Sequence, residues 1–169
     1  MKTRWIRWAV IVALVGAVTW IRTTYFTDAA RVRRALRGLI QDASFKADTG
    51  NIAKVSKFNG VLARFTDDVT ITVEQVVPQA PPLTGRSEVH PAVQAYFSQL
   101  SRSEITLHDV VISEIDPIAR TARATFTASA VTNLPGVEFA AQEFDVDLRK
   151  DPENRWLIAK VSAIRTLKR

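Results

Sequence analysis

The sequence predicts an α+β domain in which three helices cover one face of a mainly antiparallel sheet, with one transmembrane helix before the domain. In the last third of the chain, apolar and polar residues alternate in four consecutive stretches, which is typical of strands with one buried face. Upstream, three stretches repeat apolar residues every three or four positions, as amphipathic helices do. A charge-free apolar run, residues 8–21, lies near the N-terminus. Because amphipathic helices and a one-faced sheet must bury their apolar sides against each other, these patterns predict the fold class.

The composition excludes several functional classes. The 169 residues include no cysteine, which rules out disulfides and thiolate chemistry, and only two histidines, too few for a multi-histidine metal site. The net charge of +6 comes mainly from the N-terminal part, and the exposed face of the predicted sheet mixes Arg123 with Asp145 and Asp147. A sheet that binds nucleic acid would instead carry basic residues among aromatic ones. We therefore expect no metal, no cofactor and no nucleic-acid partner.

The apolar run is better explained by an uncleaved membrane anchor than by a signal peptide. As a helix, residues 8–21 would span about 21 Å, against the ~30 Å of a hydrocarbon core. Tryptophans bracket the run, and flanking arginines can reach the headgroups and lengthen the effective span: Trp5, Trp8, Trp20, Arg4, Arg7 and Arg22. Ala17-Val18-Thr19 is a poor cleavage site because Trp20 follows it. We therefore predict a cytoplasmic tail over residues 1–7 and a transmembrane anchor over residues 8–22.

The charges around this anchor indicate its orientation. Lys2, Arg4 and Arg7 favour a cytoplasmic N-terminus, whereas the five arginines between positions 22 and 37 favour the opposite. A short basic tail is hard to translocate, while folded domains cross membranes despite nearby charge. We therefore expect a single-pass protein of the inner (cytoplasmic) membrane whose domain faces the periplasm.

The first domain helix is predicted to begin at Asp28, a good N-cap residue. Its apolar stripe repeats with helical spacing and comprises Val32, Leu36, Leu39, Ile40 and Ala43. Arg31, Arg34 and Arg37 fall mostly off that stripe. They form either a solvated helix face or a contact with anionic lipid headgroups beside the anchor, and the sequence favours neither.

Two further helices and a short strand complete the upstream half. A second helix follows the polar turn at residues 48–51, with an apolar stripe from Val55 to Phe65. Alternation over residues 69–73 predicts a short strand, and a proline-rich loop follows it. The third helix is predicted from about Ser87 to Leu100, with Pro91 in its first turn and Tyr96 on its apolar stripe.

Turn signals divide the last third into four predicted strands: Ile105–Ile115, Ala119–Val131, Val137–Arg149 and Arg155–Thr166. In the two middle strands, alternation places Phe126, Gln142 and Phe144 on the inner face. On the outer face, Arg123 should lie opposite Asp145 or Asp147, so the carboxylates there are explained by cross-strand ion pairs.

The order of elements, helix–helix–strand–helix followed by four strands, resembles the nuclear transport factor 2-like superfamily, whose SnoaL-like members share it. Three loose motifs add to the resemblance: Phe65-Thr66-Asp67-Asp68-Val69, Thr84-Gly85-Arg86 and Asn154-Arg155-Trp156-Leu157-Ile158. It covers about residues 28–167, and the membrane anchor would be an addition to it. The resemblance implies a cystatin-like cone, in which a curved sheet wraps around the helices and encloses a central pocket.

Enzymes of this superfamily place carboxylates, tyrosine or histidine inside the cone, where a dry pocket shifts pKa values and strengthens electrostatic contacts. The predicted inner face shows no Asp or Glu in the middle of either long strand. The residues that we expect to line the pocket are Tyr96, His108, Phe126, Gln142 and Phe144. Tyr96 is more simply a core tyrosine, and His108 a structural or surface histidine.

Two functions from different classes follow. The first is a membrane-anchored, non-enzymatic binding or assembly module, in which the sheet could also contact a protein partner or a second copy of the chain. Membrane-anchored relatives of this shape belong to secretion and transport machines, which is an analogy. The alternative is an isomerase, dehydratase or cyclase acting on a small molecule through Tyr96, His108 and Gln142. An apolar pocket favours the module, whereas acidic residues inside it would favour the enzyme.

The anchor can be tested on the mature protein. Because Trp5, Trp8 and Trp20 bracket a run without a good cleavage site, we expect the N-terminal residues to stay attached. N-terminal sequencing of the membrane fraction should therefore return a chain that begins ahead of residue 8. A mature chain beginning after Ala17 would show a signal peptide instead.

Overall fold

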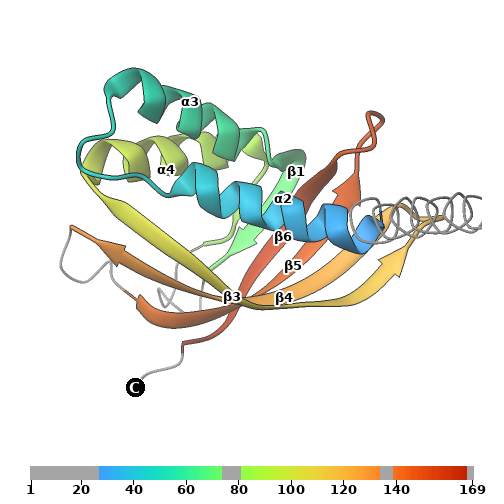
Figure 1. The fold of residues 1–169 in the computed structure, drawn as a ribbon. Helices are drawn as coiled ribbons and strands as arrows, with labels where there is room; N and C mark the ends of the chain where they lie inside the picture. Colours follow the sequence, from blue (N-terminus) through green and yellow to red (C-terminus); the bar gives the residue numbers. More distant parts are fainter. Residues whose placement is uncertain (1–26, 74–80, 134–138, 167–169) are drawn as a thin grey trace, which may run out of the picture.

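The computed structural model describes residues 27–73, 81–133 and 139–166. The elements are α2 (Asp28–Ala43), α3 (Asn51–Leu62), β1 (Phe65–Thr72), β2 (Leu83–Thr84), α4 (Arg86–Gln99), β3 (Ser103–Asp116), β4 (Thr121–Thr132), β5 (Phe139–Lys150) and β6 (Trp156–Thr166). The helices lie on one side of a curved sheet (Figure 1), which confirms the α+β class. The predicted anchor, residues 8–22, lies outside the described residues. None of the helices within these ranges is long and apolar enough to cross a bilayer.

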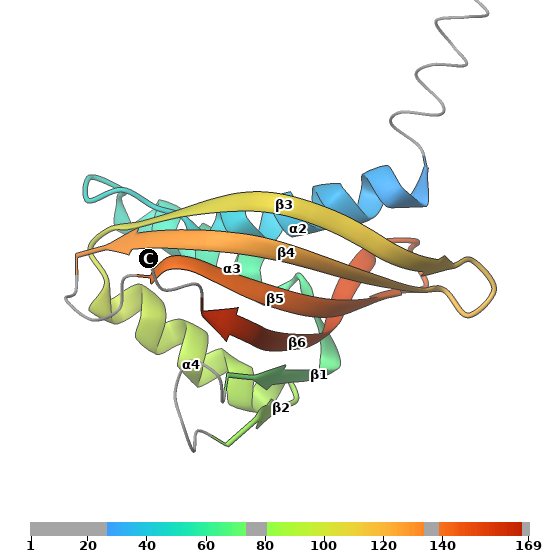
Figure 2. The same cartoon turned by 90° about the horizontal axis from the view of Figure 1, so that it is seen from below.

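The sheet has six strands in the order β2-β1-β6-β5-β4-β3. Every neighbouring pair is antiparallel except β1 and β6, which run parallel, so the prediction of a mainly antiparallel sheet is confirmed. Figure 2 shows β3 and β2 at its two edges. The sequence did not predict β2, because two residues are too few to display an alternation.

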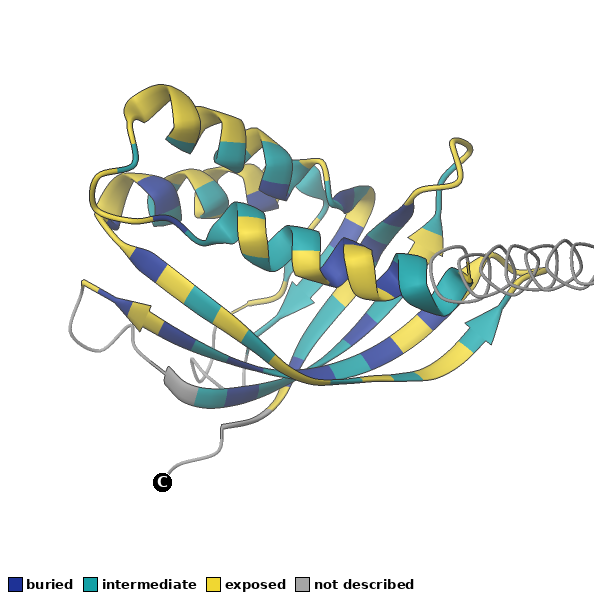
Figure 3. Cartoon of the chain, in the orientation of Figure 1, coloured by how far each residue is buried: buried dark blue, intermediate teal, exposed yellow. Residues whose placement is uncertain are grey.

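The register of β4 and β5 matches the predicted alternation. Phe126 is paired with Phe144, and their rings stack 5.3 Å apart on the inner face. On the outer face, the Nε of Arg123 lies 2.9 Å from Asp147 Oδ1 and 3.7 Å from Asp145 Oδ1. Dark and light segments therefore alternate along these strands in Figure 3. A shift of one residue would expose the buried face of the sheet.

Two irregularities lie in β3. Its register with β4 shifts between His108 and Val111 and again between Ile112 and Glu114. Asp109 has a φ of 47°, a left-handed conformation that Asp tolerates better than most residues. Bulges of this kind bend a strand and increase its twist. The bent strand accounts for part of the curvature with which the sheet wraps around the helices (Figure 1).

The first helix begins at Asp28, as predicted, but a different residue caps it. Thr27 is the N-cap, because its extended backbone lets Oγ1 accept a hydrogen bond of 3.3 Å from the Ala30 amide. Asp28 instead pairs with Lys150 at 2.8 Å, which ties the start of α2 to the end of β5. The Lys150 ammonium thereby lowers the pKa of Asp28. Tertiary contact thus gives the carboxylate a partner that the local pattern did not reveal.

The three motif stretches of the sequence lie together at one end of the fold. Arg86 forms an ion pair of 3.2 Å with Asp67, and its guanidinium also donates to the carbonyl of Phe65. Gly85 has φ 78° and ψ 157°, a conformation open essentially to glycine alone, and its amide donates to Val69. The amide of Ile158, in the third motif, donates a hydrogen bond of 2.8 Å to the carbonyl of Arg64, the residue before the first motif.

Gly85 is the N-cap of α4, so Arg86 is the first residue of the helix. The position of Pro91 within the helix therefore also differs from the prediction. The sequence placed Pro91 in the first turn of the helix, whereas it occupies the second turn, where its missing N–H removes one helical hydrogen bond.

The two faces of the sheet predict opposite responses to truncation. Phe126 is buried, and its loss should lower the free energy of unfolding by ~3–5 kcal/mol. The half-exposed Asp147 should cost less than ~1 kcal/mol when changed to Ala. Urea unfolding of Phe126→Ala and Asp147→Ala measures the difference. Equal losses would contradict the register.

Candidate functional site

An apolar cavity of about 320 Å³ lies between the helices and the inner face of the sheet. We call it the apolar cavity. Its lining comes from all three helices, from both edges of the sheet and from the central strands: Leu39, Ile40, Ala43, Val61, Phe65, Ile71, Leu83, Val89, Ala92, Val93, Tyr96, Phe97, Ile105, Phe126, Ala128, Phe144, Val146 and Val161. The cavity thus occupies the position at which the resemblance implies a pocket.

Small residues beside large ones leave this space open. Ala128 follows Phe126 on the inner face of β4, Ala43 is the last residue of α2, and Ala92 lies in the middle of α4. Methyl groups at these positions cannot fill the volume between the rings of Phe126 and Phe144 and the helices. The pattern in the sequence allows either tight helix packing or a void at this point, and the structure contains the void.

Tyr96 contributes the one hydroxyl among the described lining residues of the apolar cavity. The hydroxyl is already engaged, because it donates to the carbonyl of Ala43 at 3.0 Å and shares a short hydrogen bond with Ser103 Oγ. Ser103 is fully buried, and its backbone pairs with that of Phe45 in both directions. Burial raises the pKa of Tyr96, and the hydrogen bond from Ser103 lowers it in part. Tyr96 therefore ties α4 to the end of α2 and the start of β3.

His108 does not reach the cavity. It is exposed on the outer face of the sheet, where its Nε2 lies 3.1 Å from Ser129 Oγ. The neighbouring Leu107 packs against the core instead, so strand alternation sends His108 to the opposite side. The expectation that His108 lines the pocket is wrong for this reason.

Gln142 is buried on the inner side, yet it is not among the residues that line the cavity. Its Nε2 donates to the carbonyl of Glu143 at 3.1 Å, which directs the amide toward its own strand. Of the five residues predicted for the pocket, three therefore line it: Tyr96, Phe126 and Phe144. The helix residues Leu39 and Ile40 also line the cavity, but they were predicted only as part of an apolar core stripe. The helical period does not distinguish a core position from a cavity wall.

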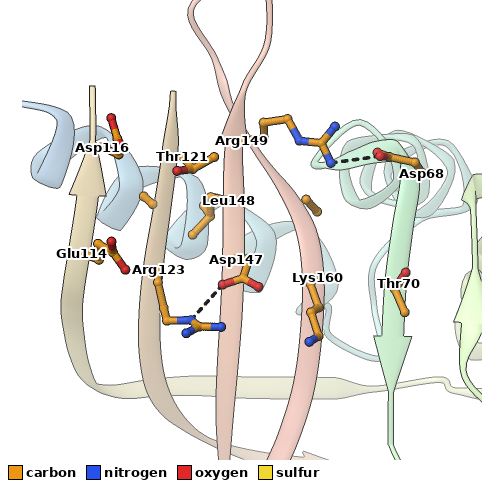
Figure 4. Close-up of a pocket in the computed structure, with 12 residues that line it drawn as sticks. Asp68, Thr70, Glu114, Asp116, Thr121, Arg123, Asp147, Leu148, Arg149 and Lys160 are labelled. Carbon is orange, nitrogen blue, oxygen red and sulfur yellow. Dashed lines mark hydrogen bonds and ion pairs between the residues drawn. The ribbon is translucent and has the colours of Figure 1, made fainter. Parts of the chain in front are cut away.

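A second hollow, the outer groove, lies on the opposite face of the sheet and has a volume of about 690 Å³ (Figure 4). Charged side chains of both signs line it, from every strand except β2: Asp68, Glu114, Asp116, Arg123, Asp147, Arg149 and Lys160. Arg149 pairs with Asp68 at 2.9 Å, and Arg123 pairs with Asp147 at the same distance. The Asp147 carboxylate raises the pKa of Arg123. Among the residues described here, no group of three acidic or histidine side chains is arranged to hold a metal ion.

No protein-family model and no curated protein matches this sequence. Solved structures, by contrast, match it over most of its length. One is a candidate aromatic ring hydroxylase from Novosphingobium aromaticivorans, with a TM-score of 0.68 and 12% identity over 83% of this chain and 90% of that one. The similarity lies in the backbone rather than in the sequence.

Two further structures name the fold. A candidate dehydratase of the nuclear transport factor 2-like family from Streptomyces avermitilis has a TM-score of 0.61 and 17% identity, over 83% of this chain and 98% of its own. A nuclear transport factor 2-like protein of unknown function from Pseudomonas putida has a TM-score of 0.61 and 13% identity, over 85% of this chain and 99% of its own. At these identities the likeness shows the fold alone, and it supports the cone that the element order predicts.

The raised pKa of Tyr96 predicts a loss of stability in alkali. An unfolded tyrosine loses its proton near pH 10, whereas folded Tyr96 keeps its proton to higher pH. The folded state then binds more protons than the unfolded state, so the free energy of unfolding should fall as pH rises above about 10. Urea unfolding between pH 8 and 11 should show a steeper fall for the wild type than for Tyr96→Phe. Parallel curves would mean that the phenol is solvated.

Proposed function

We propose that this chain is a membrane-anchored, non-enzymatic binding module that takes a small apolar ligand into the apolar cavity. The lining of the cavity supports this proposal most directly. Its described residues are aliphatic or aromatic, and they include no Asp, Glu, His, Lys or Arg. A ligand would therefore be held by burial of its surface, with the hydroxyl of Tyr96 as the nearest side-chain polar group.

The volume of the cavity restricts the ligand class. At about 320 Å³ it is near the lower end for small-molecule sites, and roughly twice the ~150 Å³ of an apolar cavity that holds benzene. A fused aromatic ring system or the end of an acyl chain would fit such a volume. Burying roughly 200 Å² of apolar ligand surface would contribute about 5 kcal/mol before the costs of ordering. We therefore expect weak, shape-selective binding.

The same lining argues against the enzymatic alternative. Proton transfer needs a group that reaches the substrate and has a pKa near the working pH. Of the three residues considered for an isomerase, dehydratase or cyclase, only Tyr96 lines the cavity. Its pKa is raised, and its hydroxyl is engaged by Ala43 and Ser103. These observations favour binding over catalysis, even though two of the similar structures carry names of candidate enzymes.

The setting of the module is part of the proposal and rests on sequence. Residues 8–22 would hold it in the inner membrane as a single-pass protein, with the domain in the periplasm. The outer groove offers paired charges of both signs on the face that the helices leave uncovered (Figure 4). A protein partner, or a second copy of this chain, could exchange those ion pairs for its own, which would make the contact sensitive to salt.

Blocking the mouth of the cavity tests the binding function. Ala92 lines the cavity yet is exposed on α4, so a larger side chain there can close the opening without disturbing the core. We expect Ala92→Trp to weaken binding of 1-naphthol and decanol at least tenfold. Methyl NMR of the full chain in nanodiscs should show, for the wild type, shifts at Leu39, Val93 and Val161.

Gln94→Trp is the matched control, because Gln94 is an exposed residue of the same helix that does not line the cavity. This variant should bind both probes like the wild type. Shifts spread over the outer face of the sheet, or equal weakening in both variants, would contradict the proposed site.

A further inference from the structure

A cleft of about 410 Å³ lies on the surface beside the N-terminal half of α2. It is formed by α2, by the end of α3 with the following turn, and by the turn between β5 and β6, which meet at one side of the molecule in Figure 1. Four of its described lining residues are charged, and all four are arginines: Arg31, Arg34, Arg64 and Arg155. We call it the arginine cleft.

From the arginine cleft we infer a binding site for the phosphodiester of an anionic phospholipid. The inference is separate from the apolar cavity and rests on the proposed anchor. Four guanidinium groups around one hollow, with no carboxylate among the described lining residues, are the chemistry that recognises phosphate oxygens.

Two of the arginines are held in place from outside the cleft. Arg64 donates through Nε and Nη2 to Asp42, at 3.2 and 3.1 Å. Arg155 donates through Nε to Asp151 at 2.7 Å, and its Nη2 lies near both Asp151 and Glu153. Within the described part of the chain, no protein acceptor pairs with Nη1 of either residue. Each guanidinium is therefore oriented in advance and keeps N–H donors for a ligand.

Two glycines make room for this arrangement. A Cβ at Gly38 would come within 2.6 Å of the Arg64 guanidinium, and a Cβ at Gly60 within 2.8 Å of the Asp42 carboxylate. The ion pair thus lies against bare backbone, where α2 and α3 approach each other. Arg31 and Arg34 are one turn apart on α2, so they reach the cleft from the same side of that helix.

The position of the cleft in the chain selects a lipid as the source of the phosphate. Arg31 lies in the first turn of α2, and five residues separate the predicted anchor, 8–22, from Asp28. A linker of this length spans at most about 20 Å when extended, so the cleft stays near the membrane surface. Basic residues there are attracted to anionic lipids. Of the three arginines that the sequence suggested for headgroups, Arg37 does not line the cleft.

The experiment compares two double variants with equal charge. Arg31→Gln with Arg34→Gln removes two cleft residues, whereas Arg33→Gln with Arg37→Gln removes the same charge from exposed positions of the same helix. Native mass spectrometry of the full chain, released from nanodiscs of phosphatidylcholine and phosphatidylglycerol, counts the anionic lipids retained. We expect the cleft variant to retain about tenfold less phosphatidylglycerol and the control variant to match the wild type.

A second arm identifies the source of the phosphate. Arginine Nε–Hε NMR signals of Arg64 and Arg155 should move when phosphatidylglycerol replaces phosphatidylcholine, and not when millimolar glycerol phosphate is added to phosphatidylcholine nanodiscs. Equal movement with free glycerol phosphate would overturn the lipid assignment, and equal lipid loss in both double variants would overturn the cleft itself. A chain that does not co-elute with nanodiscs would overturn the anchor as well, whereas naphthol binding tests the cavity independently.

Discussion

The alternation of apolar and polar residues along β4 and β5 is the constraint on which the rest of the structure depends. Phe126 and Phe144 stack on one face while Arg123 and Asp147 pair on the other, so a single register satisfies both faces at once. The buried face requires a cover, which the three helices provide. The apolar cavity is the part of this interface that side chains do not fill, and the outer groove is its charged counterpart on the uncovered face.

The helix layer is fixed to the sheet by a few specific polar contacts around an otherwise apolar interface. Lys150 joins the start of α2 to β5, and Tyr96 joins α4 to the last carbonyl of α2 and to β3. These contacts lie at opposite ends of α2, so the helix is held along its length. The cavity and the arginine cleft share this helix, yet they are lined by different sides of it. One helix therefore forms part of the wall of two separate hollows.

Much of the fold could be predicted from the sequence because strand alternation and helical stripes report directly on burial. The cross-strand pairing of Arg123 followed from the turn position alone. The residues of the candidate site were harder to predict from the sequence. His108 is a residue type that could act in a pocket, but strand alternation places it on the outer face of the sheet. The orientation of the Gln142 amide depends on the neighbouring Glu143 carbonyl, which no sequence pattern predicts. Whether alanines leave a void depends on helix placement to within one methyl group, which periodicity does not specify. The arginine cleft joins residues more than a hundred positions apart, and only the fold brings them together.

The irregular β3 has a consequence beyond curvature. As an edge strand of fourteen residues, it presents unpaired backbone groups to solvent, and a long regular edge is a template for the strands of other molecules. The left-handed Asp109 and the two register shifts interrupt that template midway, while Phe45 covers its first residue by pairing with Ser103. The same bulge that shapes the interior therefore shortens the regular edge that another strand could pair with, which is how many natural sheets avoid edge-to-edge aggregation.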